Sequence, residues 1–332
     1  MVISKTPLRI SFFGGGSDYP AWYKDNGGAV LSTSIDKYFS LTCREFVPYF
    51  GFKHHIVWSK KEEAKSTDDI QHPIVREAFK YLDIKKGIEV HYIADLPARS
   101  GLGSGSTFTV SLLHALHTLE GREPSKEQLA LEAIHIERDR LGENVGSQDQ
   151  TAAAFGGFNK IEFSGDDKIK VHPLKIEKDK LKYLEKHLLL FSTGIYRRAD
   201  SIAAEQVKKT PNLHSEIKTL QSMVDEGIDI LKGPRENINN FGKLLDNAWD
   251  IKRGLTSKIS NSTIDAIYEK AKDKGAIGGK LLGAGGGGFI LFFAEPQKHD
   301  IIKDALNNLT YVPFEFESKG SHIIFNSHEG QN

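Results

Sequence analysis

The sequence predicts an α+β protein of two domains. Its 332 residues exceed the usual size of one hydrophobic core, and strand-like runs alternate with helical stripes along the chain. The glycines bunch into three clusters, at residues 14–16, 101–105 and 283–288. We divide the chain into an N-terminal domain of residues 1–180 and a C-terminal domain of residues 181–332. A cleft between them is then available for a ligand.

Strands and helices follow one another in the first half. Residues 90–96 (VHYIADL) are typical of a strand, and an apolar stripe over residues 108–119 predicts a helix. Ser125, with a glutamine three residues later, predicts the start of a second helix that runs to Gly142. Strand-like sequence returns in GGFNKIEF, residues 156–163.

The second half repeats this mixture. It opens with an apolar strand and continues with amphipathic helices, a glycine-rich hairpin and further strands. In chain order we predict a strand at 187–194, helices at 213–231, 241–251 and 264–271, a strand at 289–293, a helix at 299–308 and a strand at 311–317.

Charge and cysteine content exclude several classes of function. The 44 basic and 44 acidic residues cancel, so no overall field favours nucleic acid or an anionic membrane. The charged stretch 60–65 is interpreted as a solvated surface turn. Cys43 has no second cysteine to pair with, and the N-terminus lacks the pattern of a signal peptide, so we expect a cytoplasmic protein. A homodimer remains open.

The second glycine cluster favours phosphate binding. The segment RSGLGSGST directly follows a predicted strand and precedes a predicted helix, whose free N–H groups attract anions. An ordinary turn capped by serines is the alternative, but alternating glycines and hydroxyls exceed what a cap needs. No Walker loop occurs in the chain. The candidate phosphate-binding residues are Arg99, Gly101, Leu102, Gly103, Ser104, Gly105, Ser106 and Thr107.

Three segments resemble the motifs of the GHMP kinases, in the order typical of that family. They are TPLRISFFGGGSDY, LPARSGLGSGST and KLLGAGGGGF, and they are distributed over nearly the whole length of the chain. The resemblance implies an N-terminal domain like part of a ribosomal protein and a ferredoxin-like C-terminal domain. It also implies that ATP and Mg²⁺ bind in the cleft between them.

The resemblance assigns two catalytic residues. Asp149, in a short polar loop before TAAAF, stands where the family keeps its catalytic aspartate. Arg9 stands where the first motif carries a cation near the reacting hydroxyl, and we expect it to pair with Asp149. The alternative for Asp149 is an N-cap of the segment that follows it.

A magnesium site is implied beside the phosphate loop. Glu137 resembles the family's magnesium carboxylate, and Ser104 and Ser106 offer hydroxyl ligands. The alternative is a glutamate on the solvent side of a helix. Gly105 stands where the family usually has a second consecutive serine, so this loop supplies one hydroxyl fewer.

The acceptor site is expected around the first and third motifs. Asp18 stands where sugar kinases of the family bind sugar hydroxyls, and glycines replace the bulky pair that galactokinases carry before it. A phosphate on the substrate would need cations, and surface charge is the alternative for each basic residue considered. The candidate substrate-binding residues are Asp18, Ser17, Gly16, Arg197, Arg198, Lys280 and Gly285.

Together these features predict an ATP-dependent sugar kinase. Within the family the chain is most similar to members that phosphorylate the anomeric hydroxyl of a heptose 7-phosphate, on the way to nucleotide-activated heptose. Another sugar 1-kinase, of the fucokinase or galactokinase type, is the first alternative. A catalytically silent regulator that binds a nucleotide or sugar is the second, because a fold alone does not fix a function.

Overall fold

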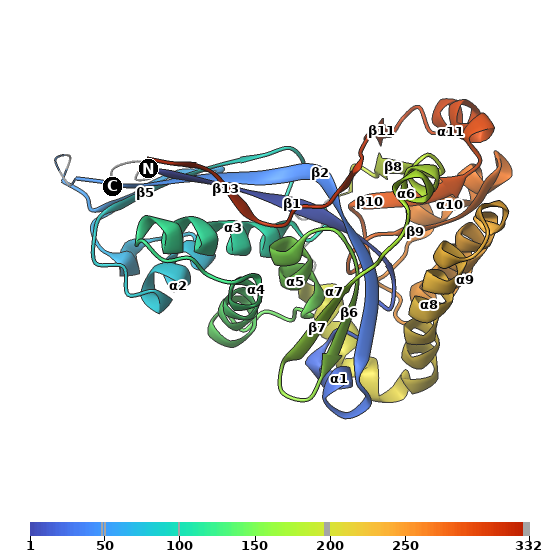
Figure 1. Cartoon of the computed structure of the whole chain (residues 1–332), viewed down its shortest axis with the longest axis horizontal. Coiled ribbons are helices and arrows are strands. Elements are labelled where there is room, and N and C mark those ends of the chain that lie inside the picture. Colours follow the sequence, from blue (N-terminus) through green and yellow to red (C-terminus); the bar gives the residue numbers. More distant parts are fainter. Residues whose placement is uncertain (48, 50, 99, 196–199, 328–332) are drawn as a thin grey trace.

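The computed structural model describes the chain from residue 1 to residue 327, apart from residues 48, 50, 99 and 196–199. Its strands form two sheets that lie one after the other along the long axis of the molecule (Figure 1). The first sheet has nine strands and the second has four, among the residues described. Met1 and Ser327, the first and last residues described, lie side by side, because the N–H of Ser327 donates to the carbonyl oxygen of Met1 at 2.9 Å.

The first sheet is built around a long antiparallel pair. β1 (Val2–Phe13) pairs with β2 (Gly28–Glu45), and the order along the sheet is β13-β1-β2-β5-β3-β4. A second branch leaves the end of β2 through β6 and β7. The remaining strands of this sheet are β3 (His54–Val57), β4 (Lys61–Ala64), β5 (Ile88–Ala94), β6 (Phe158–Ser164), β7 (Lys168–Pro173), β12 (Phe316–Glu317) and β13 (His322–Asn326).

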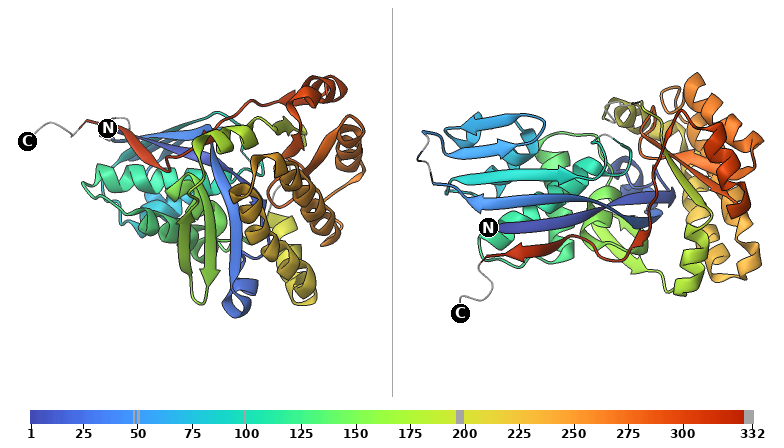
Figure 2. Two further views of the ribbon diagram at one scale, coloured as in Figure 1. Left: turned by 45° about the vertical axis from the view of Figure 1, so that its right-hand side comes forward. Right: turned by 90° about the horizontal axis from the view of Figure 1, so that it is seen from above.

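Among the residues that the structure describes, the helices next to β5 and β1 cover one face of this sheet, and the other face carries none. In Figure 1 α2, α3 and α4 lie below the strands, and the view from above in Figure 2 shows these strands with no helix in front of them. A π-helical turn, His135–Arg140, extends α4. The helices of this half are α1 (Pro20–Asn26), α2 (Pro73–Tyr81), α3 (Ser104–Leu119), α4 (Lys126–Ile134) and α5 (Gln148–Phe155), with a 3-10 turn at Thr67–Asp69.

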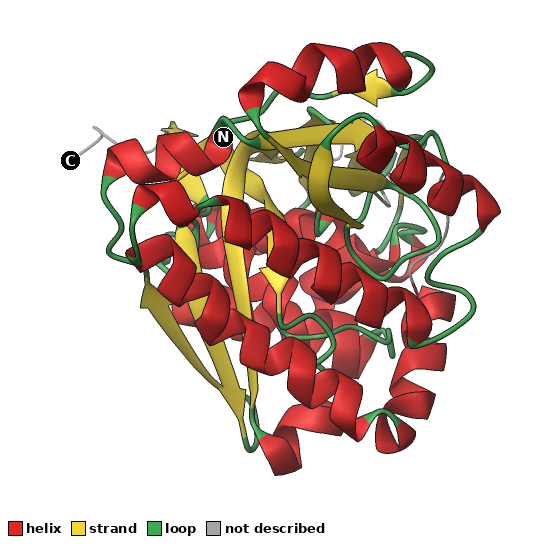
Figure 3. Ribbon diagram, turned by 90° about the vertical axis from the view of Figure 1, so that its right-hand side faces the viewer, coloured by secondary structure: helices red, strands yellow, loops and turns green. Residues whose placement is uncertain are grey.

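The second sheet has the order β11-β8-β10-β9 and is covered by the helices of the second half. Figure 3, in which this half of the molecule faces the viewer, shows helices in front of the strands. The strands are β8 (Leu188–Ser192), β9 (Ala276–Leu281), β10 (Phe289–Ala294) and β11 (Thr310–Tyr311). The helices are α6 (Lys178–Glu185), α7 (Asp200–Lys209), α8 (His214–Lys232), α9 (Asn239–Gly254), α10 (Ser262–Asp273) and α11 (His299–Ala305), with 3-10 turns at Thr210–Asn212, Arg235–Asn237 and Pro296–Lys298.

Most predicted elements are confirmed. The side chain of Ser125 caps α4 by accepting the backbone N–H of Gln128, and α8, α9 and α10 follow the apolar stripes. The charged stretch 60–65 was wrongly interpreted, because residues 61–64 form strand β4 with alternating exposed and buried residues. The predicted strand 311–317 is divided, and its second part, β12, pairs with β2 in the first sheet. The division at residue 180 stays a prediction.

Aromatic side chains join the two sheets. Phe241 on α9 packs against Phe12 and Phe13 of β1, with ring centroids 5.3 and 5.0 Å apart, and against Phe293 of β10 at 6.4 Å. All four side chains are buried. The position of the first sheet relative to the second therefore depends on a shared core. None of the helices in the described part of the chain has the length and apolar character needed to cross a membrane.

Candidate active site

One cavity of about 560 Å³ collects all three glycine clusters. It is lined by Gly15 and Gly16 of the first cluster, by Gly101, Gly103 and Gly105 of the second, and by Gly283 of the third. The cavity also contains carboxylates, cations and an aromatic end. The three glycine clusters, far apart in the sequence, thus lie around one cavity.

The second and third clusters touch backbone to backbone. The N–H of Phe289 donates to the carbonyl oxygen of Ser100 at 3.1 Å. A Cβ atom on Gly101 would lie 2.4 Å from the carbonyl oxygen of Leu282, and one on Gly283 would lie 2.5 Å from the Cα of Gly101. Both glycines also have positive φ angles, of +78° and +73°. Only glycine allows the two loops to approach this closely.

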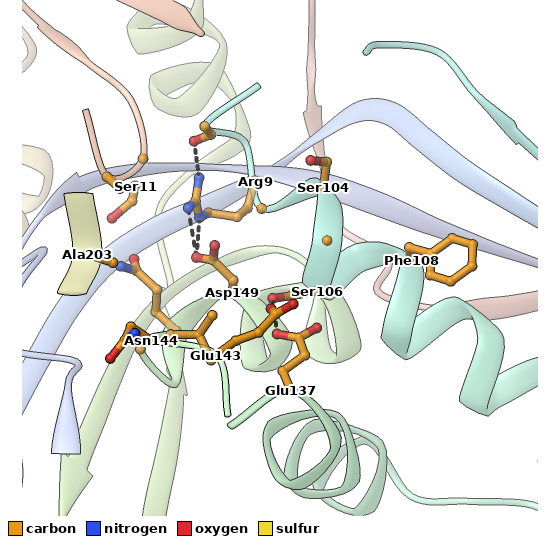
Figure 4. Close-up of a pocket in the computed structure, with 18 of the residues that line it drawn as sticks. Arg9, Ser11, Ser104, Ser106, Phe108, Glu137, Glu143, Asn144, Asp149 and Ala203 are labelled. Atoms are coloured by element: carbon orange, nitrogen blue, oxygen red, sulfur yellow. Dashed lines mark hydrogen bonds and ion pairs between the residues drawn. The ribbon is translucent and has the colours of Figure 1, made fainter. Parts of the chain in front are cut away.

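Arg9 and Asp149 form an ion pair in the cavity wall. The Nε and Nη2 atoms of Arg9 donate to Oδ1 of Asp149 at 2.8 and 2.7 Å, and Nη1 donates to the carbonyl oxygen of Gly101 at 2.9 Å (Figure 4). Arg9 is buried, whereas the Asp149 side chain is 28% exposed to the cavity. The predicted contact is confirmed. The capping alternative is not seen, because Ser147 occupies the N-cap position of α5 and Asp149 lies in its first turn.

The N-terminus of α3 opens into the same cavity. Gly103 precedes the helix with a φ of +77°, and Ser104, Gly105 and Ser106 of its first turn line the cavity. The free N–H groups and dipole of a sixteen-residue helix therefore point at this space. A Cβ atom on Gly105 would meet no atom within 4 Å, so this glycine leaves the cavity wider than serine would.

Not every residue of the predicted phosphate loop faces the cavity. Leu102 is fully buried, and its carbonyl oxygen accepts the backbone N–H of Arg9 at 3.1 Å. The hydroxyl of Thr107 donates to the carbonyl oxygen of Pro7 on β1. Neither residue lines the cavity, so both hold the loop in place through their contacts with β1 instead of facing the ligand space. Arg99 lies outside the described residues.

Glu137 is buried at the edge of the cavity rather than exposed on a helix. It accepts hydrogen bonds from the hydroxyls of Ser106, at 2.8 Å, and Thr109, and from the amide of Gln150 at 2.6 Å. Burial, helped by the charge of Glu143, raises the pKa of Glu137 to about 7 (Figure 4). The donors around it are neutral, so a divalent cation would stabilise the ionised form. This oxygen-only set of groups fits Mg²⁺.

Asp18 lies deep in the same cavity. Its Oδ1 accepts the N–H of Gly16 at 3.0 Å, and burial together with the charge of Asp149 raises its pKa. Gly16 also lines the cavity. The hydroxyl of Ser17 instead lies 2.8 and 2.9 Å from the carbonyl oxygens of Gly14 and Ala29 and accepts the N–H of Ala29, so Ser17 holds the loop and does not line the cavity.

The structure adds a lysine that sequence reasoning missed. Lys252 on α9 lines the cavity, and its ammonium group donates to the carbonyl oxygen of Gly283. Burial and the charge of Arg9 lower its pKa to about 8, against the opposing effects of Asp18 and Asp149. The sequence did carry a signal, because Lys252 continues the buried stripe of Ala248 and Trp249 on this helix.

The remaining predicted substrate residues have mixed outcomes. Lys280 lines the cavity, but its ammonium group donates to the carbonyl oxygens of Ser11 and Phe12, at 3.0 and 2.6 Å. It therefore ties β9 to β1, and burial lowers its pKa well below the usual range. Gly285 packs against Ile259 and does not line the cavity. Arg197 and Arg198 lie outside the described residues.

One end of the cavity is aromatic. The ring of His72 lies between Trp58 and Phe108, with centroids 4.8 Å from each, and Tyr92 meets Phe108 edge to face at 5.5 Å. Burial lowers the pKa of His72 to about 4, so the ring is neutral at pH 7. Figure 4 shows Phe108 on one side of the α3 N-terminus and Asp149 on the other. The cavity thus changes from apolar to charged across the first turn of α3.

Comparison with known proteins agrees with this geometry. Residues 73–157 match the GHMP kinases N terminal domain, and residues 230–311 match the GHMP kinases C terminal family. A D-glycero-alpha-D-manno-heptose 7-phosphate kinase from Campylobacter jejuni is 29% identical over 96% of this chain and 97% of its own length. A galactokinase from Pyrococcus furiosus is 25% identical over 95% of both chains.

Solved structures give the same result. The crystal structure of a D-glycero-D-manno-heptose 1-phosphate kinase from Bacteroides thetaiotaomicron superposes with a TM-score of 0.78 at 28% identity. The match covers 98% of this chain and 99% of that one. The two family matches agree with the two-domain fold of these relatives and with the convergence of the three motifs on one cavity. The chain therefore belongs to the GHMP kinases, a family of ATP-dependent kinases.

Proposed function

We propose that this kinase transfers the terminal phosphoryl group of ATP to the anomeric hydroxyl of D-glycero-D-manno-heptose 7-phosphate, giving the 1,7-bisphosphate. One observation carries the proposal. A single cavity holds an aromatic end, a helix N-terminus and the Arg9–Asp149 pair, in that order. The proteins similar to this chain over nearly their whole length include two heptose phosphate kinases, which favours a heptose as the sugar.

ATP fits the first two parts of the cavity. The apolar surfaces of Trp58, Tyr92 and Phe108 would accept a flat base, because stacking suits aromatic rings. The phosphates would then reach the N–H groups of Gly105 and Ser106, where the helix dipole favours negative charge. Glu137, Ser106 and Ser104 would hold Mg²⁺. The ion would neutralise charge on the phosphate oxygens.

The sugar fits the charged end. Asp18 would accept hydrogen bonds from sugar hydroxyls, and Asp149 would orient the attacking hydroxyl and receive its proton. Arg9 and Lys252 would stabilise the negative charge that spreads over the transferring group. Since Arg9 is already fixed by Asp149 and Gly101, little reorganisation would be needed during the reaction.

The phosphate on the sugar needs separate cations. Arg197 and Arg198 remain the proposed binding residues. Lys280 is weaker, because two of its N–H groups are used by Ser11 and Phe12. A charged hydrogen bond contributes roughly 1.5–3 kcal/mol, so one such contact distinguishes a phosphorylated sugar from its parent by about 10- to 100-fold.

The direct test is steady-state ADP release across a panel of sugars, with ³¹P NMR of the products. We expect heptose 7-phosphate to have the highest kcat/KM, by about 10-fold or more over unphosphorylated heptose, fucose and galactose. The new phosphorus signal should come from C1. The relatives are named for different phosphate positions, so heptose 1-phosphate belongs in the panel.

Three outcomes would overturn parts of this proposal. Equal use of the unphosphorylated sugar would remove the phosphate pocket and favour a fucokinase-like activity. Preference for heptose 1-phosphate would move the acceptor away from the anomeric hydroxyl. No ADP release with any sugar would favour the catalytically silent regulator.

The Asp149→Asn variant tests the proposed acceptor of the proton. It should fold normally and bind ATP, yet lose on the order of 10²- to 10⁴-fold in kcat, because the amide cannot take the proton. The matched control is Asp179→Asn, which changes an exposed first-turn aspartate of α6 outside the cavity. Near-normal turnover of Asp149→Asn would return this residue to a purely structural role.

The Glu137→Gln variant tests the proposed magnesium site. Glu137 has a raised pKa of about 7 and must ionise to bind the ion, so the wild-type Mg²⁺ requirement should fall as pH rises from 6 to 8. The variant should need about 10-fold or more Mg²⁺ and lose this pH dependence, since even indirect partners of metal ligands contribute 10- to 100-fold. Titrations of activity with Mg²⁺ between pH 6 and 8 measure both the Mg²⁺ requirement and its pH dependence.

Glu132→Gln is the control, because this glutamate on α4 pairs with His117 and does not line the cavity. It should keep the wild-type Mg²⁺ response at every pH. An unchanged response in Glu137→Gln would remove Glu137 from the metal site.

A further inference from the structure

A cluster of two histidines and a glutamate lies on the open face of the first sheet, outside the catalytic cavity. Strands β3 and β5 are parallel neighbours there, and His55 lies directly opposite Glu89. His91 follows Glu89 by two residues and so points to the same face. The residue between them, Val90, is buried in the core on the helical side. Figures 1 and 2 show no helix over the open face.

The three side chains converge on one point. The Nδ1 atom of His55 lies 2.6 Å from Oε1 of Glu89, and Nε2 of His91 lies 3.1 Å from the same oxygen. One ligand atom from each residue lies within 4.8 Å of the other two. Bond lengths of about 2.0–2.1 Å in a tetrahedral zinc site place ligand atoms about 3.3 Å apart. Small side-chain movements would therefore open this triangle around an ion.

The surroundings hold the carboxylate and one imidazole in place. Arg44 donates to the second oxygen of Glu89, which leaves Oε1 to the two histidines. The rings of Phe46 and Phe52 lie 6.1 and 5.8 Å from that of His55. The Nε2 atom of His55 is buried with no hydrogen-bond partner among the described residues, so the ring is engaged only through Nδ1. A hydrogen-bond donor that orients a carboxylate, as Arg44 does here, is typical of metal sites.

A simple charge network is the competing explanation. In it, Glu89 would neutralise Arg44 and accept hydrogen bonds from the histidines, which together lower its pKa to about 2. Arg44 alone would satisfy the charge of Glu89. In that network both imidazoles donate to one oxygen, whereas with a metal ion the same two nitrogens, from different strands, would share the ion with that oxygen. A shared ion gives that convergence a reason.

We propose that His55, Glu89 and His91 bind a divalent transition metal ion of the zinc type. Two imidazoles with one carboxylate suit Zn²⁺, Co²⁺ or Ni²⁺, whereas Mg²⁺ prefers oxygen ligands and is expected at Glu137 instead. The side chain of His91 is 47% exposed, so the ion reaches the site from solvent and keeps a position open for water.

The proposed metal site lies on the other face of the sheet from the cavity, and it would affect the positions of two residues that line the cavity. Tyr92 lies between His91 and Ile93 on β5, and Trp58 directly follows β3, and both line the aromatic end of the cavity. An ion that bridges β3 and β5 would fix the spacing of these two rings. Because the ligands come from two strands that pair only in the folded protein, binding would also stabilise the native state.

The test is a titration of tag-free, EDTA-treated protein with Co²⁺ and Zn²⁺, in excess Mg²⁺ so that the oxygen-only site does not contribute. We expect one equivalent of Co²⁺ to bind, with a visible absorption band from imidazole ligands, and Zn²⁺ to displace it and raise the Tm. His91→Ala and Glu89→Gln should each weaken binding by about 10-fold or more. His91 is half exposed, so its replacement leaves the core intact.

His172→Ala is the matched control. His172 is an exposed histidine that lies 2.9 Å from a glutamate, Glu162, and no third histidine, cysteine or carboxylate completes a metal-binding group with them in the described part of the chain. Its variant should bind Co²⁺ as the wild type does. Equal binding by wild type and His91→Ala, or no uptake of Co²⁺ or Zn²⁺ by the wild type at several equivalents, would overturn the proposal and leave the cluster as a charge network.

Discussion

The site depends on a buried guanidinium group. Arg9 is almost inaccessible to solvent, and a buried charge is costly unless it is paired and hydrogen-bonded. Its partners come from two other parts of the chain, namely Asp149 on α5 and the backbone of Gly101. A third contact, from the N–H of Arg9 to Leu102, fixes the same loop. Burial of this one cation therefore sets the positions of Asp149, the proposed catalytic carboxylate, and of the glycine loop at residues 101–105 together.

The glycine clusters follow from the same geometry. Gly103 lies beside the pair, where an added Cβ atom would meet both Arg9 and Asp149 at 3.4 Å. Gly101 and Gly283 allow the third glycine cluster, which belongs to the second sheet, to contact the second cluster backbone to backbone. The N-terminus of α3 is thereby held beside Asp149 with no side chain between them. These glycines thus contribute both backbone conformations and empty space, and the ligand would occupy that space.

Local patterns predicted the longest helices, α3, α8, α9 and α10, because each of these repeats its buried residues at helical spacing. They could not predict how β12 and β13 pair, since their pairing with β2 and β1 joins segments about 300 residues apart. The short charged strand β4 was missed because only Glu62 and Ala64 face inward, and Glu62 is polar. Where charge and burial coincide, sequence patterns of hydrophobicity give no signal.

The same limit applies to the site. Motif resemblance placed Arg9, Asp149, Ser106 and Glu137 together, and the structure brings them into one cavity. Resemblance did not distinguish residues that face the ligand from those that support the loop, such as Ser17 and Thr107, because side-chain direction in glycine-rich turns depends on tertiary contacts. Lys252 lay outside the recognised motifs and was found only through its burial beside Gly283.

A double-mutant cycle of Arg9→Met and Asp149→Asn, read in kcat/KM, tests the central claim that the pair acts as one unit. Thermal unfolding of each variant would confirm that the fold is kept. We predict that the double variant is about as slow as the slower single variant, since groups that act as a unit have strongly non-additive effects. Residues in contact show coupling of roughly 0.5–3 kcal/mol. Fully additive losses would contradict the account, because Arg9 and Asp149 would then contribute independently.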